Sequence, residues 1–335
     1  MGHSAAVWDS RLALETVKDW NGIDQIVLRN PQGGSAKVSL HGGQVISWRN
    51  ERGEELLFTS SKIMIHQQFS THHHKKTIGK SQFSIIFRKK FSLTNHRRQN
   101  GKMGKGQNRQ TFMMQHGFAR NKIWTVDDDP PPLPTNDSHG KSYVDLLLKP
   151  SEEDLKVWPH SFEFRLRVSL GMDGNLTLIS RIRNVNGKPF SFSFGYHSHL
   201  SVSDISEVRI EGLETMDYFD NLFKRERFTE QGDAITFESE IDRVYLSSPN
   251  CVAVLDHERK RTYVIRKEGL PDVVVWNPWD KKSKAMSDLG DDEYKQMLCV
   301  DGAAIEKPIT LKPGEEWTGR MEIAVVPSSF CSEDL

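Results

Sequence analysis

The chain has 335 residues, and its 45 basic side chains balance 45 acidic ones, so its formal net charge is zero. This balance excludes an overall electrostatic attraction to nucleic acid or to an anionic membrane, and any such attraction has to be local. The length permits a large core in either two domains or one all-β domain, and we expect one domain over residues 1–335.

The cysteines are few and widely spaced: Cys251, Cys299 and Cys331. An odd, scattered set does not make a disulfide framework and indicates a reducing compartment. The first 20 residues have no apolar stretch of signal-peptide length and include acidic side chains that transit peptides avoid. Since no apolar run reaches the roughly 20 residues of a membrane-spanning helix, we expect a cytoplasmic protein without a membrane partner.

The N-terminal part predicts short strands at residues 25–30 ("QIVLRN"), 36–40 ("AKVSL") and 44–50 ("QVISWRN"). This regular pattern stops after Ser61. Residues 62–114 contain 12 basic and no acidic side chains, and their apolar residues follow no sustained period. The pattern returns after this segment, which is followed by a Pro-rich loop at residues 127–140.

Alternating apolar and polar residues dominate the chain after Tyr143 and indicate strands. Residues 162–170 ("FEFRLRVSL") predict a strand with one core face and one polar face. Turns at 171–174 and 186–189 connect it to strands at 175–185 and 190–197, which predicts a three-strand meander. Helix signals are sparse: "SEEDLKVW" at 151–158, where Ser151 is a candidate cap, and "DDEYKQM" at 291–297. Together the elements predict an all-β sandwich with few short helices.

Four stretches carry candidate site residues, and each also has an ordinary structural interpretation. In "QHGFARNKIW" (115–124), Gln115, His116 and Arg120 could face an anionic or polyhydroxyl ligand, because the arginine fork suits phosphate, or the stretch is a surface turn. In "DVVVWNPWD" (272–280), Trp276 and Asn277 could line a sugar site, or they end a strand.

His197 and His199 share one face of a strand because they are two residues apart. A metal site would need further ligands, and the sequence places no spaced cysteine or second histidine pair nearby, so we expect no metal. A general acid at His197 and a structural histidine remain equal alternatives. Asp301 ends a short apolar run before Gly302, which predicts either a carboxylate presented to a cleft or an Asp-Gly turn.

The order and spacing of these stretches resemble the hexose-6-phosphate mutarotases, also called glucose-6-phosphate 1-epimerases, of the aldose 1-epimerase superfamily, most of all the plant cytosolic members. The resemblance covers roughly residues 19–329 outside the basic segment, and "QHGFAR" and "VVVWNPW" are its most specific motifs. It implies a galactose-mutarotase-like β-supersandwich without a cofactor. It also implies a small-molecule hexose 6-phosphate as the partner. We expect a monomer, and no bound nucleic acid because the aromatic residues of the basic segment lack a recognised RNA- or DNA-binding arrangement.

The resemblance implies that the α and β anomers of a hexose 6-phosphate, most simply glucose 6-phosphate, are interconverted by ring opening and closure. An acid protonates the ring oxygen while a carboxylate takes the proton of the C1 hydroxyl. The family's acid falls on His197, and its base falls on Asp301, where relatives have the longer Glu. Sugar and phosphate contacts carry over to Gln115, Arg120 and Asp242, with His116 beside them.

The basic segment departs from the family, whose members have an Arg-Gly-Gly-Ile-Pro motif there that belongs to the phosphate site. Three interpretations remain open for residues 62–114: a nucleic-acid-binding arm, a metal site at residues 72–74 ("HHH"), or translated non-coding sequence. Under the third, which we favour, we expect one sheet edge to lose its strand pairing and the phosphate site to lose an arginine. A catalytically impaired phosphosugar-binding module of the same fold is therefore the alternative function.

Overall fold

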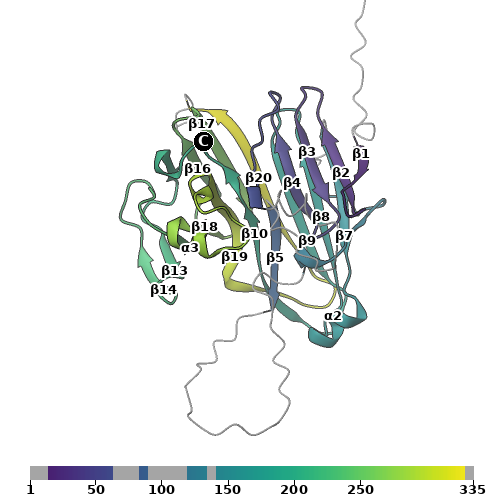
Figure 1. The fold of residues 1–335 in the computed structure, drawn as a ribbon. Helices are drawn as coiled ribbons and strands as arrows, with labels where there is room; N and C mark the ends of the chain where they lie inside the picture. The colour runs from purple at the N-terminus through teal and green to yellow at the C-terminus, as the bar shows by residue number, and fades with distance from the viewer. Residues whose placement is uncertain (1–13, 63–82, 90–118, 134–140, 329–335) are drawn as a thin grey trace, which may run out of the picture.

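The computed structural model describes residues 14–62, 83–89, 119–133 and 141–328, and consists mainly of antiparallel strands (Figure 1). An N-terminal four-stranded sheet has the order β1 (Leu14–Lys18), β2 (Asp24–Arg29), β3 (Ser35–Ser39) and β4 (Gln44–Arg49). The three N-terminal strands that the sequence predicts correspond to β2, β3 and β4. No described helix is long and apolar enough to cross a membrane.

Two eight-stranded sheets form the main body. One has the order β12 (Val208–Glu211), β16 (Cys251–Asp256), β17 (Arg261–Glu268), β20 (Glu316–Pro327), β9 (Leu176–Asn184), β8 (Phe162–Leu170), β7 (Ser142–Leu148) and β6 (Thr125–Val126). The other has the order β14 (Glu226–Thr229), β13 (Asp217–Asp220), β15 (Ile241–Tyr245), β18 (Asp272–Asn277), β19 (Met297–Leu311), β10 (Phe190–Ser198) and β5 (Phe83–Lys89), with β11 (Leu200–Ser201) paired to β19.

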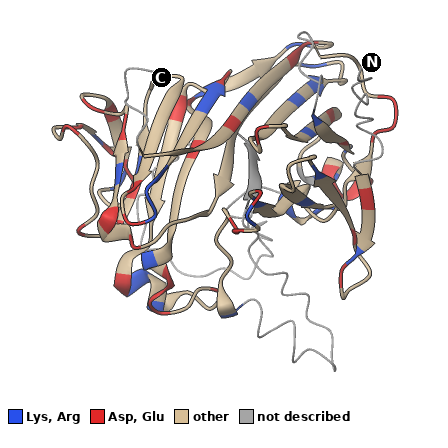
Figure 2. Ribbon diagram, turned by 90° about the horizontal axis from the view of Figure 1, so that it is seen from above, with Lys and Arg blue, Asp and Glu red and all other residues tan. Residues whose placement is uncertain are grey.

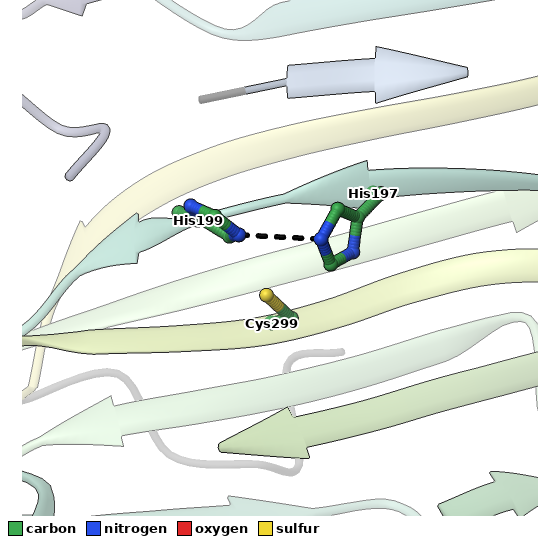
Figure 3. Close-up of side chains that lie close together, drawn as sticks. All are labelled: His197, His199 and Cys299. Atoms are coloured by element: carbon green, nitrogen blue, oxygen red, sulfur yellow. Dashed lines mark hydrogen bonds between the residues drawn. The ribbon is translucent and has the colours of Figure 1, made fainter. Parts of the chain in front are cut away.

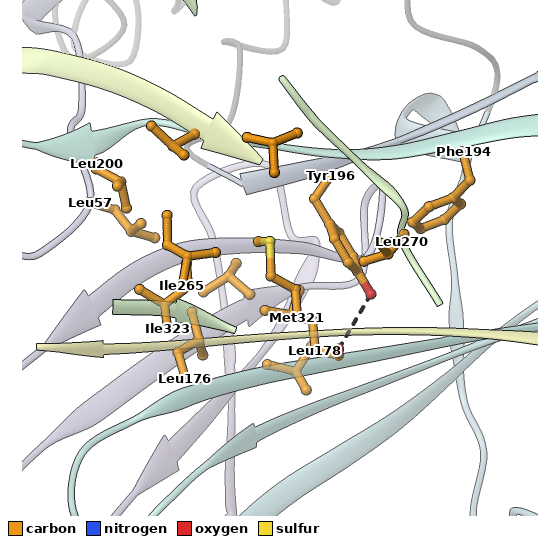
Figure 4. Close-up of a cluster of buried hydrophobic side chains, with 14 of the residues drawn as sticks. Leu57, Leu176, Leu178, Phe194, Tyr196, Leu200, Ile265, Leu270, Met321 and Ile323 are labelled. Carbon is orange, nitrogen blue, oxygen red and sulfur yellow. Dashed lines mark hydrogen bonds between the residues drawn. The ribbon is translucent and has the colours of Figure 1, made fainter. Parts of the chain in front are cut away.

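A buried apolar layer joins the two large sheets (Figure 4). Phe194 and Tyr196 of β10 point into it, and Tyr196 lies beside Leu178 and Met321 from the opposite sheet. The Tyr196 hydroxyl is satisfied there, because it donates to Ser180 Oγ at 3.0 Å. Alternation along β10 therefore turns its even-numbered aromatic residues into the core and leaves His197 on the other face.

The predicted three-strand meander is wrong in its third strand. β8 and β9 pair as expected, but β10 belongs to the opposing sheet, where it pairs with β19 and β5. On the polar face of β8, Arg167 is buried and forms an ion pair with Asp145 (Nη2–Oδ2 2.7 Å). Sequence alternation describes one strand but cannot say which sheet the next strand joins.

The expected loss of strand pairing at the sheet edge is also wrong. Within the basic segment, β5 pairs antiparallel with β10 over seven residues, from Phe192 opposite Lys89 to Ser198 opposite Phe83. The signal for this strand is the local alternation of Phe83, Ile85 and Phe87, which the surrounding basic residues conceal. The backbone edge beside β10 is therefore covered.

Helices are short, as predicted. α2 (Glu152–Val157) begins at Ser151, which forms a capping box with Asp154. The second helix signal becomes the 3-10 helix η3 (Glu293–Gln296), and η1 (Ala119–Asn121) and η2 (Ile205–Glu207) are 3-10 turns. α3 (Trp279–Ala285) was not expected from the sequence. Acidic and basic residues are both scattered over the described ribbon (Figure 2).

Candidate active site

A row of side chains crosses the sheet that contains β10. The strand register sets Asp242 of β15 opposite Trp276 of β18, and Trp276 opposite Cys299 of β19. Residues directly opposite one another on antiparallel strands project to the same face. Three strands therefore present a carboxylate, an indole and a thiol side by side.

The two histidines complete this row from the end of β10. The rings of His197 and His199 lie 5.8 and 6.0 Å from the Trp276 ring, centroid to centroid. Their Nε2 atoms are 3.2 Å apart, so one ring donates a hydrogen bond to the other (Figure 3). His199 is buried, whereas the His197 side chain is 15% exposed. His197 is thus the more exposed of the two histidines.

Asp301 lies in the middle of a strand and not at its end. The prediction of a carboxylate presented to a cleft, or of an Asp-Gly turn, is wrong, because β19 continues through Gly302 and Asp301 has zero exposure. The carboxylate lies between β19 and β10, in a gap between the pairs Gly195–Ala303 and Leu200–Leu298. There it accepts the Ser198 N–H at 2.9 Å and the Ser198 hydroxyl at 2.5 Å.

Burial determines the ionisation of Asp301. Loss of hydration raises its pKa to about 7, although the Ser198 hydroxyl and amide bonds act in the opposite direction. The carboxyl is therefore divided between its neutral and charged forms near neutral pH. Its Oδ2 lies 3.9 Å from His197 Nδ1, which is beyond hydrogen-bond length but close enough for electrostatic interaction. The structure thus brings together the predicted acid and base.

Asp242 stands at the other end of the row, beside a lysine that sequence reasoning missed. Its carboxylate accepts a hydrogen bond from Asn221 Nδ2 at 2.7 Å, and Lys282 Nζ lies 3.8 Å away. Burial raises the pKa of Asp242, while Asn221 and Lys282 oppose this shift. Lys282 also lies over the Trp276 ring, 5.9 Å from its centroid. The aromatic ring is thus flanked by imidazoles on one side and by a charged pair on the other.

Arg120 lies in η1, on a different element from the row. Burial lowers the pKa of its guanidinium and nearby Asp288 opposes this effect, while Nη1 is buried without a hydrogen-bond partner in the described residues. Asp288 and His199 help to line one pocket, whose other residues are Phe58, Ser60, Trp276, Met286, Leu289 and Met297. Asp288 thus lines the pocket beside the histidines and also interacts electrostatically with the Arg120 guanidinium. Gln115 and His116 lie outside the described residues.

Asn277 has a structural setting. Its side-chain amide is fully buried and donates to the carbonyls of Tyr294 and Met297, both at 2.8 Å. Its oxygen accepts the backbone N–H of Trp279 at 2.9 Å, which fixes the start of α3. Because all three groups bind within the protein, we do not include Asn277 among the proposed sugar contacts.

The expectation that no further metal ligand lies near the histidines is wrong. Ligand atoms of His197, His199 and Cys299 all lie within 4.8 Å of one another. The signal was present in the sequence: Cys299 is two residues before Asp301, so both share one strand face. What the sequence did not give was the pairing of β19 with β10.

The sequence profile of the aldose 1-epimerase family matches residues 24–324. A Cenchrus ciliaris protein provisionally named glucose-6-phosphate 1-epimerase is 56% identical over 96% of this chain and 90% of its own length. A Salmonella typhimurium protein of the same provisional name is 27% identical over 83% of this chain and 82% of its own length.

Solved structures show the same fold. The crystal structure of a provisionally assigned mutarotase from Salmonella typhimurium has a TM-score of 0.71 at 23% identity, covering 95% of this chain and 98% of that one. A galactose mutarotase-like protein from Clostridium acetobutylicum has a TM-score of 0.68 at 18% identity, covering 94% and 98%. The predicted galactose-mutarotase-like all-β fold is therefore confirmed. The chain belongs to the aldose 1-epimerase family of isomerases.

Proposed function

We propose that this protein interconverts the α and β anomers of a hexose 6-phosphate, with glucose 6-phosphate as the first candidate. The observation that carries the proposal is the pair formed by His197 and Asp301, 3.9 Å apart on adjacent strands beside an aromatic ring. An imidazole and a carboxyl that titrates near neutral pH supply the acid and the base that ring opening requires. The substrate is suggested by the names of the relatives and by the cationic Arg120.

In the proposed mechanism, His197 protonates the ring oxygen while Asp301 accepts the proton of the C1 hydroxyl. The C1–O5 bond breaks, the open chain rotates about C1–C2, and closure on the other face returns both protons. Because Asp301 is fully buried, we infer that its carboxylate reaches the sugar through one bridging water or by a small shift at the β10–β19 gap.

Binding contacts follow from the same row. We propose that Trp276 stacks on the apolar face of the sugar, that Asp242 accepts hydroxyl hydrogen bonds, and that Arg120 holds the phosphate with Gln115 and His116. The buried Nη1 of Arg120, which has no partner in the described structure, is suited to an anionic oxygen. We also place the protein in the cytoplasm, where thiols such as those of Cys251 and Cys299 remain free.

A direct test replaces His197 by Gln and measures the exchange rate between the two anomeric proton signals of glucose 6-phosphate by NMR. We expect a loss of about 100-fold or more, the usual contribution of an acid–base group, with affinity for the phosphosugar largely retained. His257→Gln is the matched control, because His257 is exposed in the turn between β16 and β17, which belong to the other large sheet. Exchange at the unmodified rate in His197→Gln would remove His197 from the chemistry.

One observation favours the alternative of a phosphosugar-binding module without turnover. Asp301 is shorter than the Glu of the family and has no exposed surface. In that case glucose 6-phosphate binds, as measured by calorimetry, but the anomeric exchange rate equals that of the buffer. The same NMR measurement on the unmodified protein therefore separates the two functions.

A further inference from the structure

Three potential metal ligands meet in the row described above (Figure 3). His197 and His199 contribute ring nitrogens from one strand segment, and Cys299 contributes its sulfur from β19. The two Nε2 atoms are 3.2 Å apart, and the three ligand atoms lie within 4.8 Å of one another. The geometry points to a site for a zinc-class divalent cation, and we propose that zinc binding there reversibly switches off the enzyme.

The distances fit a tetrahedral ion. Zinc bonds of about 2.0–2.1 Å to nitrogen and 2.3 Å to sulfur place two nitrogens about 3.3 Å apart and a nitrogen about 3.6 Å from the sulfur. The observed 3.2 Å between the Nε2 atoms already matches the first value. The sulfur needs a movement of about 1.2 Å at most, which a cysteine rotation supplies. The His197 side chain is partly exposed, so solvent can reach this ligand.

Two acidic side chains, Asp301 and Asp242, act electrostatically on Cys299, and negative charge favours a bound cation. Burial raises the pKa of the Cys299 thiol well above its usual value, and the negative charges of Asp301 and Asp242 raise it further. Without an ion the sulfur is therefore protonated. On binding, the S–H bond breaks, its proton goes to solvent, and the thiolate bonds to zinc. The same two carboxylates then stabilise the bound cation electrostatically.

The expected inhibition by zinc rests on the proposed role of His197 as the general acid. A zinc ion on its ring nitrogen occupies the lone pair that has to carry the proton to the sugar. The ion and the reaction therefore compete for one atom, and zinc acts as an inhibitor and not as a cofactor. Cys299 and His199 have no role in the proposed acid–base steps, so they can be changed without removing the acid or the base.

The test uses Co²⁺ as a spectroscopic substitute for zinc, because only a thiolate ligand gives a sulfur-to-cobalt charge-transfer band. The starting protein carries His72→Gln, His73→Gln and His74→Gln, which remove the histidine run of the basic segment. We expect one Co²⁺ per chain with this band, and inhibition of anomeric exchange by Zn²⁺ that a chelator reverses. Cys299→Ser should lose the band and weaken Zn²⁺ inhibition at least about ten-fold. The matched control is the double variant Cys251→Ser, Cys331→Ser, which should retain both.

The outcomes are distinguishable. Absence of the charge-transfer band, or its persistence in Cys299→Ser, overturns the metal site. If Cys299→Ser does not fold, His199→Gln replaces it, and unchanged Co²⁺ affinity in that variant overturns the site equally. A band at full Co²⁺ occupancy with an unchanged exchange rate supports the site, but it overturns the proposed switch and refutes His197 as the acid. A protein without any turnover that still gives the band refutes the proposed function alone.

Discussion

The Ser198 hydroxyl should control the ionisation of Asp301. It donates a hydrogen bond of 2.5 Å to a carboxylate that has no exposed surface, and Ser198→Ala removes this bond alone. The two Ser198 N–H contacts, at 2.9 and 3.0 Å, remain because they belong to the backbone. The substitution therefore perturbs the charge of the proposed base without removing it.

The magnitude follows from the energy of such a bond. A hydrogen bond to a charged group contributes about 1.5–3 kcal/mol, and one pKa unit corresponds to about 1.4 kcal/mol. The Asp301 pKa of about 7 should then rise by about 1–2 units. At pH 7 the ionised fraction falls from about a half to between about a tenth and a hundredth, so kcat/KM should fall roughly 5- to 50-fold.

The pH profile provides the assay. A base acts in its deprotonated form, and both proteins share the same acid, so the rate of Ser198→Ala divided by that of the unmodified protein should rise with pH and approach one above about pH 9. Anomeric exchange measured by NMR between pH 6 and pH 9.5 gives both profiles. Ser193→Ala is the matched control, since Ser193 is buried on the same strand. If kcat/KM of Ser198→Ala is unchanged, or falls by the same factor at every pH, then Asp301 is not a base whose pKa the Ser198 hydroxyl lowers.

Three further predictions concern the base, the phosphate contact and a buried lysine. Asp301→Asn should reduce kcat about 100-fold with little change in the Kd for glucose 6-phosphate. Asp301→Glu should keep kcat within about ten-fold of the unmodified protein, and it should lower Tm because the site is packed. Equal losses of kcat in both variants would contradict a carboxylate base. Arg120→Gln should raise KM for glucose 6-phosphate about 10- to 100-fold without affecting that for glucose, and an equal effect on both sugars would exclude a phosphate contact. Lys267 donates to the carbonyls of Ser248 and Leu270, and burial lowers its pKa to about 8. Because the unfolded chain then binds more protons between about pH 8 and pH 10.4, the free energy of unfolding should rise with pH in this window. Urea unfolding at pH 7.5 and 9.5 should show a smaller rise in Lys267→Met, and an identical rise would contradict the shifted pKa.

The sequence predicted the elements of this fold better than their arrangement. Alternation identified β2–β4, β8, β9 and β10, because period-two burial is a local property of a strand. It missed β5, whose alternation is short and surrounded by basic residues, and it placed β10 in the wrong sheet. Sheet membership depends on contacts between distant residues that leave no periodic signal.

The same distinction applies to the site. By itself the sequence determined the residue types available for acid–base chemistry and, through a resemblance, the family to which the chain belongs. Only the tertiary structure decided that Cys299 faces the two histidines, that Asn277 binds backbone groups, and that Asp301 is buried between two strands. Burial, hydrogen-bond partners and cross-strand neighbours are set by residues about 100 positions apart, such as Ser198 and Asp301, so they exist only once the sheets have formed.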